Sequence, residues 1–223
     1  MHLINSDKKK YINIASFIVL LLPISLIFSR FIADLSIVIL SILFFFIRGE
    51  KKLFDNKIVI IAFIFIFYCT ISSVLSSNII FSLKSSFLHL RFIFFLLTIS
   101  ILFLYCKKNF LKNLFFIFLT CYLCLFFDAT IQFFFKQNIF GYTISPTTRV
   151  SSFFFDELIL GSYLSRLFPL LVFLYFFLKL KINRYLIIYF LIHLYFVTFV
   201  TGERLSFIIL NIYYLLFIFF IIK

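Results

Sequence analysis

The sequence predicts an all-α protein, a polytopic transmembrane helix bundle of about eight spans with one long outer loop. Hydrophobic residues make up 65% of the 223 residues and charged residues only 13%, whereas a soluble domain averages about 45–50% and about 25%. The apolar residues come in runs about as long as a membrane-spanning helix. They do not alternate with polar residues as the strands of a transmembrane barrel would. A water-soluble domain is therefore excluded.

The individual spans follow from the positions of these runs, since a helix needs about 20 apolar residues to cross a bilayer. The runs cover residues 11–29, 31–47, 58–76, 92–106, 114–127, 157–178, 185–200 and 205–222. The fourth and fifth runs are short, so we expect their helices to extend into the flanking residues. The first run is long and no signal-peptidase motif follows it, so it is a span. We expect one transmembrane domain over residues 1–223, with its outer loop at 128–156.

Basic residues in alternate connections orient the spans, because Lys and Arg near span ends are retained in the cytoplasm. Fourteen of the 21 basic residues fall in the set that includes the amino terminus: Lys8, Lys9, Lys10, Arg48, Lys51, Lys52, Lys57, Lys107, Lys108, Lys112, Lys179, Lys181, Arg184 and Lys223. The alternate set holds Arg30, Lys84, Arg91, Lys136, Arg149, Arg166 and Arg204. The amino terminus is therefore predicted to be cytoplasmic. These clusters also account for the net charge of +13, so the predicted partner is membrane lipid and no nucleic acid.

The two sides also differ in the kind of basic residue. Twelve of the fourteen Lys residues lie on the predicted inner side, and five of the seven Arg residues lie on the outer side. Arg carries a planar, permanently charged fork that binds phosphate or carboxylate in a bidentate way. The outer arginines therefore predict an anionic ligand there. The alternative is that each one reaches lipid head groups or pairs with a nearby acid.

The connection over residues 128–166 is too long for a simple hairpin between two spans, and we expect short helices against the outer face of the membrane. Asp128 and Gln132 are spaced one helical turn apart and would share a face. Asp156 and Glu157 begin the next predicted helix. Carboxylates at that position cap the helix and interact favourably with its dipole.

Two arginines mark candidate binding positions in the outer connections. Arg149 precedes the predicted helix start by seven residues, which would place a cation beside exposed backbone N–H groups and create an anion site. The second position is the T-G-E-R motif at residues 201–204, a tight turn between two apolar runs. Glu203 and Arg204 are adjacent in sequence, so on a helix they point apart and each needs its own partner. The alternative is a plain turn with an incidental charge pair.

These residues carry a family resemblance. The segment R-V-S-S-F-F-F-D-E-L-I-L-G-S-Y-L-S-R-L-F-P from Arg149, followed by T-G-E-R, resembles the O-antigen ligase and O-antigen polymerase superfamily. The preceding D-A-T-I-Q-F-F-F-K-Q-N-I-F-G is similar to the lead-in to the first large outer loop of that family. The resemblance in motifs covers residues 128–210, and the order of spans is consistent over the rest of the chain.

The resemblance implies a glycosyltransferase at the periplasmic face of the bacterial inner membrane. Its donor would be a glycan carried on undecaprenyl diphosphate. The acceptor would be lipid A core sugar of lipopolysaccharide in a ligase, or another repeat unit of a growing polysaccharide in a polymerase. The family uses no cofactor, metal or nucleotide sugar.

The functional arginines of the family carry over to Arg149 and Arg204, as catalytic residues that hold the donor diphosphate and neutralise the leaving group. Arg91 and Arg166 would extend this cationic surface. The remaining candidate substrate-binding residues are Asp128, Gln132, Asp156, Glu157 and Glu203. No residue is assigned as the general base.

The chain departs from the family in one respect. The family has a further outer loop with a functional histidine beyond the point where this chain ends. His2 is cytoplasmic, His89 lies in the predicted 77–91 connection, and His193 falls within a span, where we expect it to pack. None fits that role, so we expect the chain to be the amino-terminal part of a larger bundle.

Two other functions share the observed features. A transporter or flippase for an anionic lipid-linked substrate would also need outer arginines, but transporters commonly show internal repeats and interrupted helices near the bilayer midplane. The two halves of this chain show no convincing repeat. A non-catalytic membrane subunit would tolerate substitution of every outer arginine.

Overall fold

The computed structural model describes residues 6–47, 57–105, 108–144, 149–155 and 157–222. Nearly all of these residues are helical, and their only β-type pairing is an isolated bridge between Gln137 and Thr143. The predicted all-α class is confirmed.

Each predicted span coincides with a helix. The helices of the described residues are α1 (Ser6–Phe28), α2 (Arg30–Ile47), α3 (Lys57–Val74), α4 (Ile79–Leu88), α5 (Leu90–Tyr105), α6 (Lys108–Phe135), the 3-10 helix η2 (Ser152–Phe154), α7 (Leu160–Leu178), α8 (Arg184–Val200) and α9 (Arg204–Ile222). Five helical stretches are long and apolar enough to cross a membrane, and three shorter apolar helices accompany them. The protein is therefore a membrane-embedded helical bundle.

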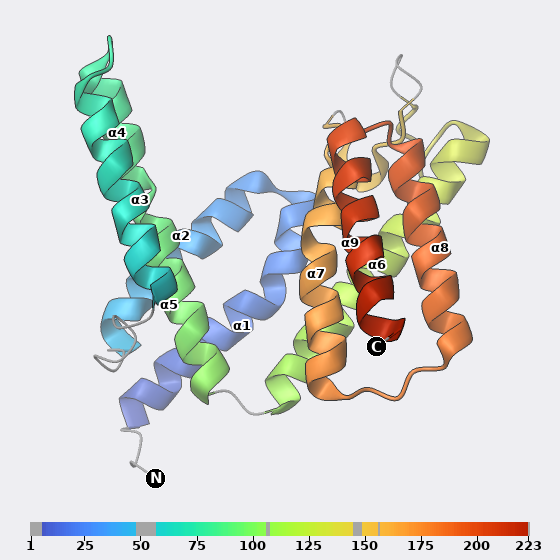
Figure 1. The fold of residues 1–223 in the computed structure, drawn as a ribbon, viewed down its shortest axis with the longest axis horizontal. Coiled ribbons are helices and arrows are strands. Elements are labelled where there is room, and N and C mark those ends of the chain that lie inside the picture. Colours follow the sequence, from blue (N-terminus) through green and yellow to red (C-terminus); the bar gives the residue numbers. More distant parts are fainter. Residues whose placement is uncertain (1–5, 48–56, 106–107, 145–148, 156, 223) are drawn as a thin grey trace. The chain divides into compact units, whose positions relative to one another are not determined.

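The helices form two compact units, Met1–Lys107 and Lys108–Lys223. In the first unit α2 packs on α1 and α5, and α3 packs on α4. In the second unit α7 is central and packs on α6, α8 and α9 (Figure 1). Helices thus bury their apolar faces mainly against near neighbours in the sequence, so that each unit has its own core.

The first unit is joined by hydroxyl groups, which need partners because a bilayer core offers no water. The Oγ atoms of Ser73 on α3 and Ser86 on α4 are 2.6 Å apart. Thr98 on α5 donates to the backbone carbonyl of Leu40 on α2 over 2.8 Å. The hydroxyls therefore tie neighbouring helices together where their backbones come close.

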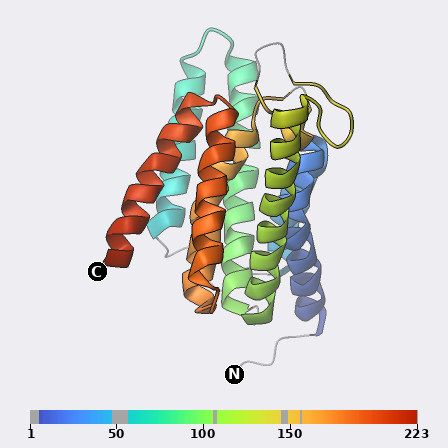
Figure 2. The same ribbon diagram turned by 90° about the vertical axis from the view of Figure 1, so that its right-hand side faces the viewer.

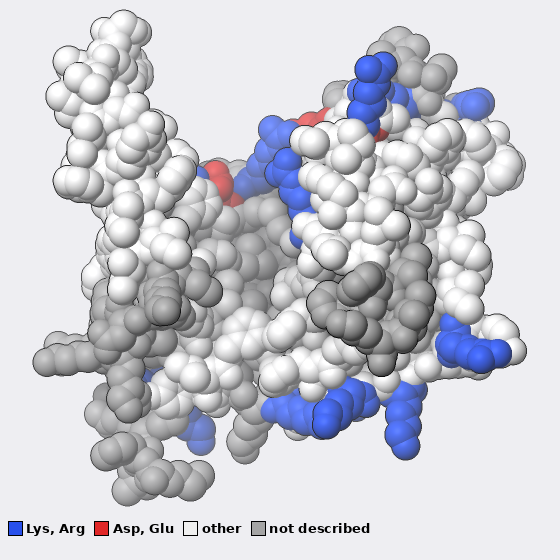
Figure 3. All heavy atoms as spheres, viewed as in Figure 1, with Lys and Arg blue, Asp and Glu red and all other residues white. Residues whose placement is uncertain are grey.

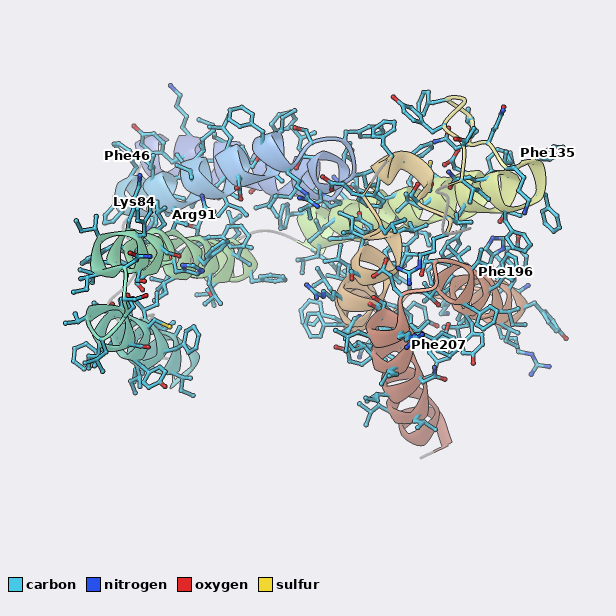
Figure 4. The ribbon with its side chains drawn as sticks, turned by 90° about the horizontal axis from the view of Figure 1, so that it is seen from above. Phe46, Lys84, Arg91, Phe135, Phe196 and Phe207 are labelled. Atoms are coloured by element: carbon cyan, nitrogen blue, oxygen red, sulfur yellow. The ribbon has the colours of Figure 1, made fainter. Side chains whose placement is uncertain are left out.

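The predicted 77–91 connection is itself mostly helical. Residues Ile79–Tyr105 form one apolar stretch of 27 residues across α4 and α5, interrupted at His89. Lys84 and Arg91 therefore lie on helices of the first unit rather than in an outer loop (Figure 4). The prediction took this more polar stretch for a connection, but Ser82 and Ser86 of α4 find partners in Ser76 and Ser73, which lets the stretch remain helical beside α3.

In the second unit the predicted fifth span extends at both ends, as expected, into the 28-residue helix α6. The helix continues through Asp128, so the outer loop predicted to begin there starts only after Phe135, where Lys136 adopts a φ of 62°. Tyr122 on α6 donates to the Leu164 carbonyl of α7 over 2.6 Å. The polar side chains of α6 are thus buried against other parts of the second unit, and α6 continues as a helix past the predicted end of the span.

His193 packs between helices of the second unit, as predicted for a residue within a span. Its Nε2 is 3.0 Å from Thr130 Oγ1 on α6. Its ring also stacks on Phe126 with 5.0 Å between the ring centroids.

The second unit has two chemically different ends. We call one the loop end, defined by the described residues of the 136–159 connection and the 201–203 turn, which lie at the same end of the unit in both ribbon views (Figures 1 and 2). We call the other the lysine end, where Lys108 opens α6 and Lys179 and Lys181 follow α7. On the face shown in Figure 3, basic side chains of this unit gather toward its ends, with largely uncharged surface between.

One hydroxyl inside the second unit has no hydrogen-bond partner among the described residues. Ser165 Oγ on α7 is fully buried and unpaired. An unpaired buried hydroxyl costs about 1–3 kcal/mol, so Ser165→Ala is expected to leave the thermal unfolding temperature unchanged or raise it. Ser206→Ala is the control, since the Ser206 hydroxyl donates to Glu203 over 2.8 Å, and it should lower that temperature. A clear loss of stability in Ser165→Ala would show that the hydroxyl has a partner.

Candidate functional site at the loop end

Two polar side chains of α6 hold the outer connection in place. Gln132 Oε1 accepts hydrogen bonds from the backbone N–H groups of Ser151 (3.0 Å) and Ser152 (2.7 Å). Asp128 accepts from the Ile139 N–H (2.9 Å) and the Ser152 hydroxyl (2.6 Å). Both side chains are fully buried. Their contacts fix the backbone two residues after Arg149, which gives them a positioning role; their predicted contact with substrate stays a prediction.

Asn138, which the sequence did not single out, also holds the outer connection in place. We call Asp128, Gln132 and Asn138 the clamp. Its side-chain oxygen accepts from the Tyr142 N–H over 2.8 Å, and its amide donates to the Ser152 carbonyl over 3.1 Å. Residues 136–144 therefore form a tight turn closed on Asn138, with Gly141 at a φ of +83°. The expected short helices are reduced, among the described residues, to η2.

Asp128→Ala is expected to lower the free energy of unfolding by about 2–3 kcal/mol, because it leaves the buried Ser152 hydroxyl and the part-buried Ile139 N–H without their charged acceptor. Amide hydrogen exchange in residues 136–155 should rise with it, since the connection loses its anchor. Asp128→Asn keeps one acceptor and should lose less. Asp34→Ala is the matched control: that carboxylate is 58% exposed and 3.4 Å from Arg91, so its loss should cost less than about 1 kcal/mol. Equal losses in the two alanine variants would contradict the clamp.

Arg149 lies against the T-G-E-R turn. A Cβ atom built on Gly202 would be 3.2 Å from Arg149 Nε and 3.4 Å from its Cγ. Gly202 has a φ of +65°, so both the turn and the close approach of Arg149 favour glycine at this position. Arg204 follows two residues later, and its Cα can be at most about 7.6 Å from that of Gly202. The two predicted catalytic arginines therefore flank one turn.

Glu203 finds its partner across the helix interface. Its Oε1 accepts from the Gly161 N–H over 2.7 Å. Its Oε2 accepts from the Ser162 N–H (2.9 Å), the Ser162 hydroxyl (2.6 Å) and the Ser206 hydroxyl (2.8 Å). The carboxylate thus caps the amino terminus of α7 from α9. A carboxylate there also interacts favourably with the helix dipole.

This geometry corrects two predictions. The helix α7 begins at Leu160, later than the predicted start at Asp156 and Glu157, and its cap is Glu203 from 42 residues further along. The N–H groups of the helix terminus are also not exposed as predicted, because Glu203 already occupies them. The anion site predicted from those N–H groups is wrong, and Arg149 lies against Gly202 instead.

The remaining predicted residues are distributed as follows. Glu157 is half-buried before α7, where its N–H donates to the Phe154 carbonyl over 2.9 Å. Asp156 lies outside the described residues. Arg166 is exposed on α7, one turn beyond Ser162. Arg91 belongs to the first unit, with its Nη2 3.4 Å from Asp34 Oδ1. The structure therefore brings Arg149, Glu203 and Arg204 to one turn. Asp128 and Gln132 hold the backbone that follows Arg149.

The charges at the loop end favour an anion. Among the described residues, Arg149 and Arg204 form no salt bridge. Glu203, which directly precedes Arg204 in the sequence, has its oxygens engaged by α7 and α9. Arg149 is half-buried and Arg204 is exposed. Guanidinium groups in this setting can bind phosphate oxygens through paired hydrogen bonds.

No family model, curated protein sequence or solved structure matches the chain. The residues of the loop end and their contacts are therefore the basis on which a function is proposed.

Proposed function

We propose that the chain is a membrane glycosyltransferase of the O-antigen ligase or polymerase type. It would move a glycan from undecaprenyl diphosphate to a lipopolysaccharide core or a growing polysaccharide. The supporting observation is the contact of Arg149 with Gly202, which joins the two arginine motifs that carry the family resemblance. These motifs are separated by a whole helical hairpin in the sequence, so their meeting in space is not a consequence of local chain geometry.

We infer that the loop end faces the periplasm and that the amino terminus is cytoplasmic, in the bacterial inner membrane. The distribution of basic residues supports this orientation. The lysine end of the second unit carries Lys108, Lys112, Lys179 and Lys181, and such residues are retained on the cytoplasmic side. A periplasmic loop end would meet a lipid-linked donor and its acceptor on the same side of the membrane.

In the proposed reaction Arg149 and Arg204 hold the diphosphate of the donor. As the acceptor hydroxyl forms the new glycosidic bond, the bond between the anomeric carbon and the diphosphate oxygen breaks, and negative charge grows on the leaving undecaprenyl diphosphate. Fixed guanidinium groups stabilise that charge most in the transition state. Glu203 would not compete for these arginines, because its oxygens are engaged by α7. Its role is to fix the turn that carries Arg204.

The test uses the protein reconstituted in liposomes with a fluorescent glycan on undecaprenyl diphosphate and a lipopolysaccharide-core acceptor. A transferase yields a fluorescent product joined to the acceptor. A flippase instead makes the donor accessible in the opposite leaflet without a new glycosidic bond. A chain that does neither is a non-catalytic subunit, and the proposal would then be rejected.

A further inference from the structure

An apolar groove of about 430 Å³ runs along the second unit between α7 and α9. Its α7 wall includes Phe168, Pro169, Phe173 and Phe176, and its α9 wall includes Tyr213. Phe173 and Phe176 are each 51% exposed. In a membrane-embedded bundle such a surface contacts the hydrocarbon tails of lipids. The groove is long and narrow enough to hold one such tail.

A cation lies at the end of this groove nearer the loop end. Arg166 shares a face of α7 with Pro169 and Phe173, because positions three and seven residues apart lie on one side of a helix. Side chains on a helix lean toward its amino terminus, so the exposed guanidinium of Arg166 extends from the groove toward the loop end. Among the described residues it forms no salt bridge. An apolar channel with a positive charge at one end matches a lipid with an anionic head group.

The length of the groove favours a single acyl chain. Its α7 wall extends from Phe168 to Phe176, which at 1.5 Å per residue is about 12 Å. One leaflet contributes about 15 Å of the roughly 30 Å hydrocarbon core. A single acyl chain fits this length, whereas a long polyprenyl chain would extend well beyond it.

We propose that the groove binds one acyl chain of an acidic phospholipid from the surrounding leaflet, with the phosphate of its head group at Arg166. This site is separate from the proposed donor site at Arg149 and Arg204, and it does not depend on the glycosyltransferase function. The acyl chain is already in hydrocarbon, so the groove contributes close packing contacts rather than hydrophobic burial, and Arg166 selects for negative charge.

The test places the full chain in nanodiscs of phosphatidylcholine with a small fraction of phosphatidylglycerol that carries a photoactivatable group in its acyl chain. Crosslinks are expected in the peptide that contains residues 168–176, and unlabelled phosphatidylglycerol should compete for them more strongly than phosphatidylcholine. Arg166→Gln should reduce the crosslinking about 5-fold, the equivalent of about 1 kcal/mol for one basic residue near the head groups. Lys136→Gln is the matched control, since it removes a cation from the loop end but not from the groove, and it should leave the crosslinking unchanged.

Three results would overturn the proposal. Crosslinks that avoid α7 would exclude the groove as the site. Equal crosslinking in Arg166→Gln and the unsubstituted protein would exclude the head-group contact. Displacement by undecaprenyl diphosphate but not by phosphatidylglycerol would assign the groove to the donor. A failure of glycan transfer, by contrast, would leave the crosslinking result unaffected, so the two proposals fail separately.

Discussion

Arg149→Ala is expected to lower the rate of glycan transfer by at least about 100-fold, the usual effect of removing one preorganised group that stabilises developing charge. Its side chain rests on Gly202 and has no carboxylate partner among the described residues. The charge of Arg149 is thus available to a ligand, and its loss should leave the fold intact. Transfer is measured with the fluorescent donor, and insertion and helix content are measured in parallel by membrane fractionation and circular dichroism.

A conservative substitution and a distant control sharpen this test. Arg149→Lys should also lose much of the activity, because a point charge cannot replace the two parallel hydrogen bonds of the guanidinium fork. Arg184→Ala removes the same side chain at the lysine end, where its Cζ is 5.2 Å from the ring centroid of Tyr185. That variant should retain transfer. Full activity in Arg149→Ala, with wild-type protein levels, would exclude the diphosphate role.

Glu203→Ala is expected to lower the free energy of unfolding of the second unit by about 3 kcal/mol. The substitution leaves the N–H groups of Gly161 and Ser162 and the hydroxyl of Ser206 without their acceptor. Charged hydrogen bonds contribute about 1.5–3 kcal/mol each, and unpaired buried donors add a cost of their own. Thermal unfolding in detergent measures the change. Glu203→Gln retains one oxygen acceptor and should be intermediate.

Gly161→Ala tests the same contact from the other helix. A Cβ atom at this position would be 2.7 Å from Thr201 Oγ1 and 3.0 Å from Glu203 Oε1, so the two side chains must move and the cap weakens. We expect a loss of stability in the same direction as for Glu203→Ala, and less than the sum of both losses when the substitutions are combined. Full additivity would mean that the two residues act independently.

The span positions were predictable because bilayer thickness imposes a length and a composition on every helix. The eight apolar runs therefore coincide with helices. The ends of the helices were less predictable. The helix α6 continues through Asp128 and Gln132 because these side chains bind a connection that returns to them, and a return of the chain cannot be read from local composition.

In the candidate site, too, local features were predictable and contacts between distant segments were not. The sequence identified Arg149 and Arg204 from their place in the outer connections, and it indicated that Glu203 needs a separate partner. It did not identify that partner, because a cap supplied by a distant helix leaves no local pattern. Ser162 and Ser206 were missed for this reason, although Ser206 follows Glu203 by one helical turn. The sequence instead indicated Asp156 and Glu157 as the cap of this helix, because capping residues are usually local to the helix start.

The cap at Glu203 also determines how freely α9 can move. Polar contacts from Glu203 and Ser206 join α9 to α7 at the loop end, whereas further along the pair the apolar groove lies between the two helices. Further along, α9 is held to α8 as well, since the Tyr214 hydroxyl donates to the Leu191 carbonyl over 2.6 Å. The groove therefore lies beside a helix that is fixed both at the turn and near its middle. A lipid tail that fills the groove would not need to move the turn that carries Arg204.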